Sequence, residues 1–164
     1  MNAQKKKPTA QRIERILAVA TLFIIIAAWF LGRSQAEADL VPSLKQALPD
    51  AIHFSSLSGD IYSAWNTETE EELIGYVALG SSQGFGGELR TAVAVSPAGE
   101  VIGQAVIEHK ETTAFFRRVQ RSLMASSFQG KNYSDPFILG EDVDTVTGAT
   151  YSSRALAEIT IILL

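Results

Sequence analysis

The chain has 164 residues, 46% of them hydrophobic and 20% charged, so its composition predicts one folded domain rather than a disordered chain. It contains no cysteine, which excludes thiolate-ligated iron–sulfur clusters, thioether-attached haem, cysteine-based zinc sites and disulfides from this chain. The net charge of −4 is unevenly divided, because residues 1–33 carry a net charge of +5 and residues 34–164 a net charge of −9. An acidic domain without a basic stripe binds nucleic acid poorly, so no nucleic-acid partner is expected.

Residues 16–31 form an apolar run that only Thr21 interrupts. As a helix this run extends roughly 24 Å, slightly less than the ~30 Å hydrocarbon core of a bilayer. The long side chains of Arg15 and Arg33, at its two ends, can close the difference by reaching toward the lipid headgroups. The run therefore predicts a membrane segment.

Five basic residues precede the apolar run and one follows it. The positive-inside rule then predicts a cytoplasmic tail over residues 1–15, a transmembrane anchor over 16–32, and the rest of the chain outside the cytoplasm. A cleaved signal segment is the alternative, because residues 34–36 place small side chains where a signal peptidase cuts. Both interpretations export the acidic domain.

The remainder of the chain predicts an α+β domain, with antiparallel strands and flanking helices, over residues 51–164. A short amphipathic helix or linker is expected before it, over residues 36–50. The residues between 51 and 72 show no clear pattern. The expected elements are strands over 73–80, 89–96 and 101–108 and helices over 112–128 and 152–164, with a hairpin turn at Pro97, Ala98, Gly99 and Glu100.

Residues 159–164 are almost wholly apolar. They are either the buried end of the last helix or the start of a second membrane helix. The sequence alone leaves both open.

Thr147, Gly148, Ala149 and Thr150 directly precede the last expected helix. The backbone N–H groups at a helix N-terminus attract anions, and the two small residues allow a large group to approach the backbone. The segment therefore suits a phosphate site. A threonine or serine cap after a flexible glycine is the alternative that the residues leave open.

The pattern from Asp144 to Thr150, D-x-x-T-G-A-T, resembles the flavinylation motif of the FMN-binding domains of Rnf-type and Na⁺-translocating NADH:quinone oxidoreductase complexes. In that family a flavin transferase cleaves FAD and joins FMN through its phosphate to the last threonine of the motif. The resemblance implies covalent FMN on Thr150. The resemblance also implies that the residues around Thr150 bind the cofactor, namely Asp144, Thr147, Gly148, Ala149, Ser152 and Ser153.

Two further segments support the resemblance, which covers residues 73–158. Gly84, Phe85, Gly86 and Gly87 resemble the family's G-Y-G-G turn. His109, Glu111 and Thr112 resemble its H-x-E-T segment, and both segments lie near the flavin in that family. The chain departs from the family where P-G-L-G usually follows, so the loop over the flavin is expected to be built differently.

The resemblance implies a membrane-anchored electron carrier that works with other subunits of a membrane redox complex and has no catalytic or metal site of its own. Residues 51–164 would be its exported FMN-binding domain. One alternative is the flavin domain of a membrane-bound regulator similar to the nitrous-oxide-reductase regulator family. Another is an exported binding module without flavin. No residue identifies the electron donor, the acceptor or a coupled ion.

Overall fold

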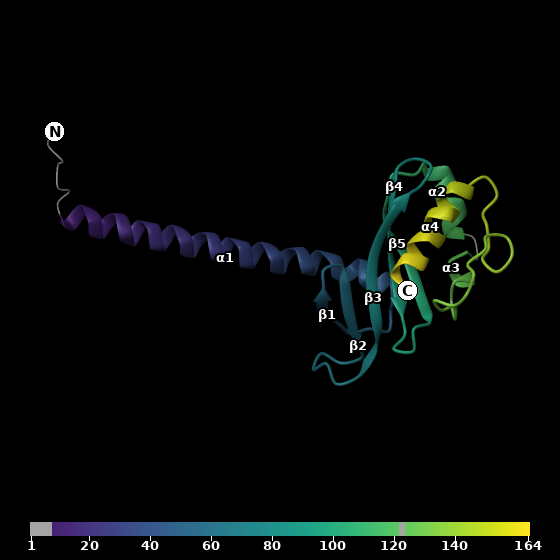
Figure 1. Ribbon diagram of the computed structural model, residues 1–164, viewed down its shortest axis with the longest axis horizontal. Coiled ribbons are helices and arrows are strands. Elements are labelled where there is room, and N and C mark those ends of the chain that lie inside the picture. Colours follow the sequence, from purple (N-terminus) through teal and green to yellow (C-terminus); the bar gives the residue numbers. More distant parts are fainter. Residues whose placement is uncertain (1–7, 122–123) are drawn as a thin grey trace. The chain divides into compact units, whose positions relative to one another are not determined.

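The computed structural model describes residues 8–121 and 124–164, which divide into two compact units at the boundary between Leu40 and Val41 (Figure 1). The first unit consists of helix α1 (Pro8–Ala47) up to Leu40. Its Arg15–Gly32 stretch has 18 residues, a mean hydropathy of 2.2 and no buried residue. A helix that is apolar on all sides and this long can cross a bilayer.

The segment expected as a separate amphipathic helix over residues 36–50 is the continuation of α1, which ends at Ala47 and contains Pro42. Between Gly32 and Pro42 the sequence holds no glycine or proline, the two residues that most disfavour a helix, so the helix continues through this stretch. Within the second unit, the last turns of α1 bury Leu44 and Ala47. Burial of this stripe gives these turns the amphipathic character that the sequence indicates.

The second unit is built on a five-stranded antiparallel sheet in which every strand pairs with its neighbours in the sequence. The α+β prediction with antiparallel strands is confirmed. The strands are β1 (His53–Ser58), β2 (Ile61–Trp65), β3 (Leu73–Gln83), β4 (Glu88–Val95) and β5 (Val101–His109). The predicted hairpin turn joins β4 to β5, with the Gly99 N–H donating to the Ser96 carbonyl (2.9 Å) and Gly99 at φ 86°, a conformation that favours glycine.

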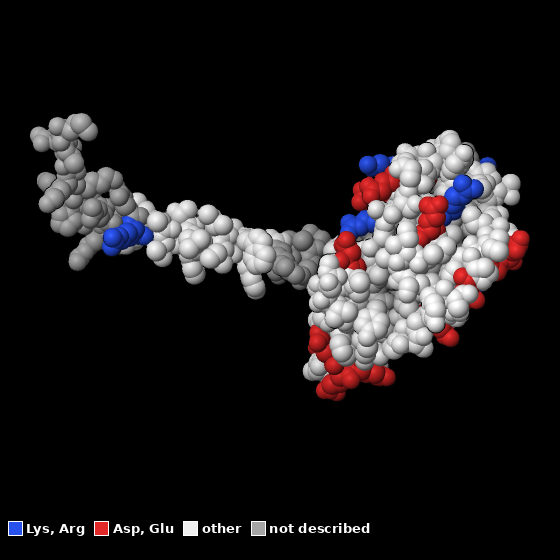
Figure 2. Space-filling view, in the orientation of Figure 1, with Lys and Arg blue, Asp and Glu red and all other residues white. Residues whose placement is uncertain are grey.

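Strands β1 and β2 lie in the stretch where the sequence shows no clear pattern. β1 is rich in serine and half-exposed to exposed along its length, so it lacks the alternation that marks a strand. Its pairing with β2, from His53 with Trp65 to Ser58 with Ile61, holds it in the sheet. The turn that follows β2 carries the exposed residues Glu68, Glu70, Glu71 and Glu72, which lie where acidic side chains gather in Figure 2.

Three helices follow the sheet: α2 (Thr113–Arg121), α3 (Met124–Ser127) and α4 (Thr150–Leu163). The helix expected over 112–128 corresponds to the helical segments Thr113–Arg121 and Met124–Ser127; residues 122–123, between them, lie outside the described residues. The sequence of this stretch places apolar side chains on one side of a helix, and of these Phe116, Val119 and Phe128 are buried. Phe115 and Leu123 belong to the same apolar side, but their side chains lie outside the described part.

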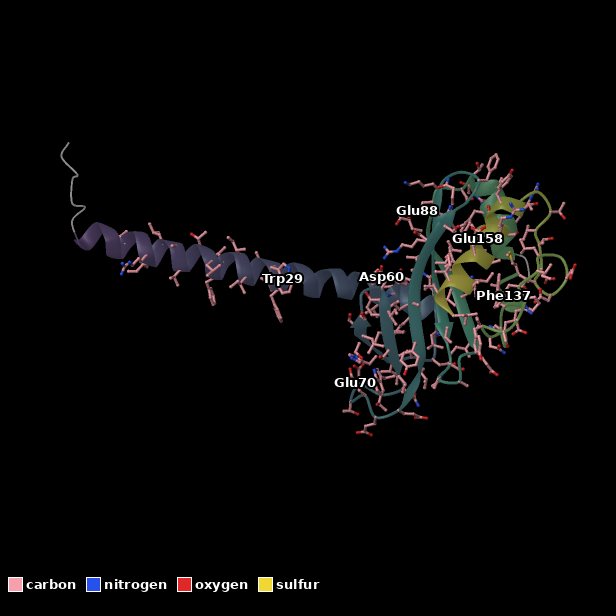
Figure 3. All side chains as sticks on the ribbon, viewed as in Figure 1. Trp29, Asp60, Glu70, Glu88, Phe137 and Glu158 are labelled. Atoms are coloured by element: carbon pink, nitrogen blue, oxygen red, sulfur yellow. The ribbon has the colours of Figure 1, made fainter. Side chains whose placement is uncertain are left out.

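Helix α4 packs on β3 and β4, and this packing determines where its first residue, Thr150, lies. A Cβ on Gly80 would lie 2.9 Å from the Ile159 Cγ2 atom, so the glycine allows the helix to approach the sheet. The Ser82 hydroxyl donates to Glu158 (2.8 Å), which is labelled on the same helix in Figure 3. Near the end of α4, Ile159 is buried and Ile162 is exposed.

Candidate functional site

The N-terminus of α4 lacks a side-chain cap. Thr150 is the first helical residue, Ala149 is the N-cap residue, and no hydrogen bond from a described side chain caps this end. Gly148, at φ 79°, turns the chain into the helix through a conformation that favours glycine. The first backbone N–H groups of a helix have no partner within it, and its dipole is positive here, so this end can receive a phosphate. The helix-cap interpretation of Thr150 does not fit this geometry.

The hydroxyl groups near this end differ in exposure. The side chains of Ser152 and Ser153 are buried, with 1% and 0% of their surface exposed. Ser152 donates to Glu111 (2.9 Å), and Ser153 accepts from the Val146 N–H (3.2 Å). Thr147 and Thr150 are both exposed, and of these two it is Thr150 that lines the adjoining pocket.

This pocket has a volume of about 260 Å³ and lies beside the start of α4. Its lining residues are Phe85, Gly148, Ala149, Thr150, Tyr151 and Ser152. The rings of Phe85 and Tyr151 are 66% and 62% exposed, with their centroids 6.0 Å apart and their planes at 43°. Such a distance is typical of aromatic pairs. An apolar surface with two accessible rings, next to a helix N-terminus, suits a ligand that combines an aromatic ring system with a phosphate, as FMN does.

A second depression, of about 300 Å³, has a different character. It is lined by Asp60, Ser81, Glu88, Arg90, Glu108 and Lys110. Arg90 pairs with Asp60 across it (3.2 Å). Charged side chains of both signs offer an aromatic ring system no apolar surface, so the pocket at α4 is the better candidate.

The segments expected near a cofactor meet at the carboxylate of Glu111. The Gly84 N–H donates to the Gly87 carbonyl (2.8 Å) and closes the turn between β3 and β4. The N–H groups of Phe85 and Gly86 donate to Glu111 (2.7 and 3.0 Å), whose side chain also accepts from Ser152. The structure therefore brings together the turn at 84–87, the segment at 109–112 and the start of α4.

The neighbouring residues at the end of β5 have other contacts. The ring of His109, which is half-buried, stacks on Phe116 with centroids 3.5 Å apart. Phe116 belongs to the core, since 7% of its surface is exposed. Thr112 is exposed, and its carbonyl accepts from the Phe116 N–H (3.0 Å). Where the family usually has P-G-L-G, this chain begins helix α2.

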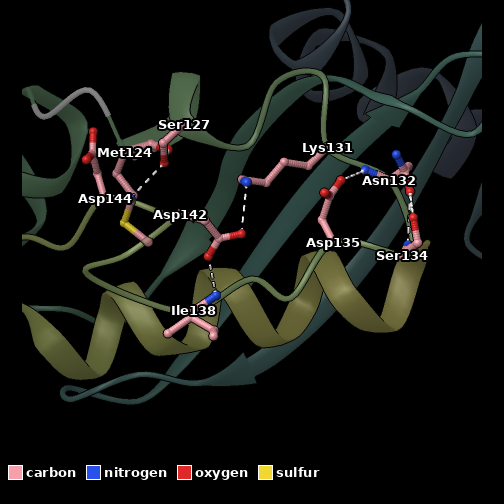
Figure 4. A network of polar contacts seen from close by, with 9 residues as sticks. All are labelled: Met124, Ser127, Lys131, Asn132, Ser134, Asp135, Ile138, Asp142 and Asp144. Atoms are coloured by element: carbon pink, nitrogen blue, oxygen red, sulfur yellow. Dashed lines mark hydrogen bonds and ion pairs between the residues drawn. The ribbon is translucent and has the colours of Figure 1, made fainter.

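Asp144 lies on the loop that leads to Thr147 and Thr150, and its own side chain is exposed and outside the pocket. Figure 4 shows how the loop is held: the Asp144 N–H donates to Ser127 (3.1 Å), and Lys131 pairs with Asp142 (2.9 Å). The hydrogen bond from Lys131 lowers the pKa of Asp142 below its usual range. These contacts hold the loop at the start of the motif.

The structure adds one residue to the predicted site, since Tyr151 lines the pocket. Its place directly after Thr150 is the signal that points to it in the sequence. Within the described ranges, no group of three or more histidine, aspartate or glutamate side chains could hold a metal ion.

Comparison with known proteins identifies the domain that contains this site. Residues 84–161 match the family model of the FMN-binding domain. The chain is 27% identical to the G subunit of the proton-translocating ferredoxin:NAD(+) oxidoreductase complex of Clostridium ljungdahlii, over 71% of this chain and 65% of that protein. It is 26% identical to the G subunit of the ion-translocating oxidoreductase complex of Cereibacter sphaeroides, over 72% and 63% of the two chains. The match thus spans slightly less than two thirds of each relative.

The fold is shared with a solved structure. The crystal structure of Shewanella oneidensis NqrC superposes with a TM-score of 0.50 at 20% sequence identity, over 71% of this chain and 66% of that chain. The segment that matches the family contains the turn at 84–87, Glu111 and Thr150. Residues 84–161 therefore resemble an FMN-binding domain, and the chain is similar to the G subunits of ion-translocating oxidoreductase complexes.

Proposed function

We propose that this chain is a membrane-anchored electron-transfer subunit that carries FMN, joined through its phosphate to Thr150, within a larger membrane redox complex. The observation that carries the proposal is the exposed Thr150 side chain at the uncapped start of α4, beside an apolar pocket and inside the FMN-binding match. The similar proteins are named as subunits of ion- or proton-translocating oxidoreductase complexes, which supports partner subunits.

Bound FMN supplies the redox chemistry, because its ring system takes up and releases one or two electrons. The role of this chain's own residues is to hold and orient it. The positive end of the α4 dipole stabilises the phosphate charge. Phe85 and Tyr151 offer apolar surface to the ring system, and Gly148 and Ala149 leave the backbone accessible between the two.

Attachment requires a flavin transferase and FAD. The Thr150 Oγ1–phosphorus bond forms, the phosphoanhydride bond of FAD breaks, AMP leaves and the threonine proton is released. The chain must therefore gain the mass of one FMN less one water.

Mass spectrometry of the intact chain, co-expressed with a flavin transferase and magnesium, tests the attachment. We expect the adduct in the wild-type chain and in Thr147→Ala, which removes an exposed hydroxyl outside the pocket and serves as the matched control. Thr150→Ala should abolish it, whereas Thr150→Ser, which keeps a hydroxyl with less restricted χ1, should be modified in part. An adduct that survives Thr150→Ala, or that maps to Thr147, contradicts the assignment.

We further propose that residues 16–32 are a retained anchor with residues 1–15 in the cytoplasm, so that the FMN-binding domain lies on the periplasmic side of the inner membrane. The excess of basic residues before the apolar stretch of α1 supports this orientation. A reporter fused after residue 60 should be active outside the cytoplasm, and the chain should stay with membranes after a high-salt wash. Reporter activity in the cytoplasm contradicts the orientation, and release of a shortened soluble chain contradicts the anchor.

A further inference from the structure

Glu111 is a buried carboxylate at the point where three segments of the domain meet. Its side chain is 6% exposed, and it is the residue that follows Lys110 at the end of β5. One oxygen accepts from the Phe85 N–H (2.7 Å) and the Ser152 hydroxyl (2.9 Å), and the other accepts from the Gly86 N–H (3.0 Å). Three donors thus stabilise its negative charge in place of water.

The turn at 84–87 approaches Glu111 closely because it lacks side chains at its glycines. A Cβ on Gly84 would lie 2.0 Å from a Glu111 carboxylate oxygen, and a Cβ on Gly86 would lie 2.4 Å from the Lys110 carbonyl oxygen. Neither distance is possible between real atoms, so only glycine permits these hydrogen bonds. The glycines of the turn and the glutamate therefore form one structural unit.

The residue that this unit holds in place is Phe85, whose backbone N–H is fixed by Glu111 and whose ring lines the pocket beside Thr150. The hydrogen bond from Ser152 joins the same carboxylate to the first turn of α4. We propose that Glu111 is a positioning residue of the flavin site: without facing the pocket itself, it sets the position of the Phe85 ring relative to Thr150 and Tyr151. This inference rests on the proposed attachment of FMN at Thr150.

A carboxylate suits this position better than an amide. Both oxygens of an ionised glutamate accept hydrogen bonds, whereas a glutamine side chain has one oxygen and an NH₂ group that only donates. In Glu111→Gln the NH₂ group must face the N–H of Phe85 or of Gly86, so at least one of these two hydrogen bonds is lost. The variant keeps the size of the side chain and changes its charge and its hydrogen bonding.

The test uses the full chain in detergent after co-expression with a flavin transferase. Visible circular dichroism and fluorescence anisotropy of the attached FMN report how firmly the ring system is held, and intact mass reports attachment separately. We expect Glu111→Gln to retain adduct at Thr150 but to lose visible dichroism and anisotropy. The matched control is Glu108→Gln, which changes an exposed glutamate three residues away and should leave both signals at wild-type values.

A double variant distinguishes an effect of Glu111 that acts through the Phe85 ring from an effect of Glu111 on the FMN itself. If Glu111 acts through that ring, Phe85→Ala lowers the two signals and adding Glu111→Gln lowers them no further. Ser152→Ala, a milder change that removes one donor, should shift the signals in the same direction by less, which keeps the test available if Glu111→Gln does not fold. The inference is overturned if the dichroism and anisotropy are unchanged in Glu111→Gln or Ser152→Ala, or if the losses caused by Glu111→Gln and Phe85→Ala add in full. In these cases an adduct in the wild-type chain still supports the proposed function. A wild-type chain that gains no mass overturns both.

Discussion

Substituting Gly86 by alanine measures how closely the turn at 84–87 must approach the end of β5. A Cβ at this position would lie 2.4 Å from the Lys110 carbonyl oxygen and 3.0 Å from the Glu111 Cα, both backbone atoms that cannot rotate away. Gly86 does not have a positive φ, so alanine tolerates its backbone conformation. The substitution therefore tests the close approach alone.

The size of the effect follows from these distances. To reach a separation of about 3 Å from the carbonyl oxygen, the turn must move outward by roughly 0.6 Å. That movement stretches the hydrogen bond between the Gly86 N–H and Glu111, now 3.0 Å long, beyond the usual limit. A hydrogen bond to a charged group contributes about 1.5–3 kcal/mol, and the residual overpacking adds to its loss. We expect Gly86→Ala to lower the free energy of unfolding by about 2–4 kcal/mol.

Urea unfolding of the full chain in detergent, followed by near-ultraviolet circular dichroism, measures this loss. The midpoint should fall while the slope with denaturant stays constant, as for a pure change in stability. Gly32→Ala is the matched control, because it is the same chemical change at a position where the added Cβ meets no atom within 4 Å. If Gly86→Ala unfolds at the same urea concentration as Gly32→Ala, the turn does not lie against residues 110–111 and the reasoning fails.

Three further predictions concern the rest of the domain. Lys131 lowers the pKa of Asp142 below its ordinary 3.8, so ionised Asp142 stabilises the fold above about pH 4, and this contribution is lost as pH falls toward the lowered pKa of the folded state. Asp142→Asn should therefore weaken the dependence of urea unfolding on acid pH. An unchanged dependence contradicts the pairing of Lys131 with Asp142. A Cβ on Gly103 would lie 1.9 Å from the Ala47 carbonyl oxygen, so Gly103→Ala should displace the last turn of α1 and speed amide hydrogen exchange in residues 44–48, whereas unaltered exchange contradicts this packing. Thr91 is fully buried, and its hydroxyl oxygen has no hydrogen-bond partner within the described residues; Thr91→Val should thus match or exceed the wild-type chain in stability by up to about 1–2 kcal/mol in urea unfolding, and a clear loss would show that this hydroxyl has a partner.

The sequence by itself determined the features that depend on nearby residues. Alternating apolar residues and the Pro97–Gly99 turn are enough to specify the β4–β5 hairpin, because strand pairing across a short turn is local. The apolar run of α1 likewise follows from composition over one contiguous stretch. The last helix is expected over 152–164 and found as Thr150–Leu163. The motif at its start is also visible in the order of residues, and the match to the FMN-binding domain includes it.

Tertiary structure decided what depends on residues far apart in the chain. β1 has a serine-rich sequence and becomes a strand because it pairs with β2. The tertiary structure also decides which hydroxyl groups remain exposed at the start of α4. Ser152 is buried and donates to Glu111, whereas Thr150 is exposed. The partners of Glu111 lie 26, 25 and 41 residues away. No local pattern encodes such contacts, because the free energy that favours them arises only when the sheet and α4 have already brought these groups out of water.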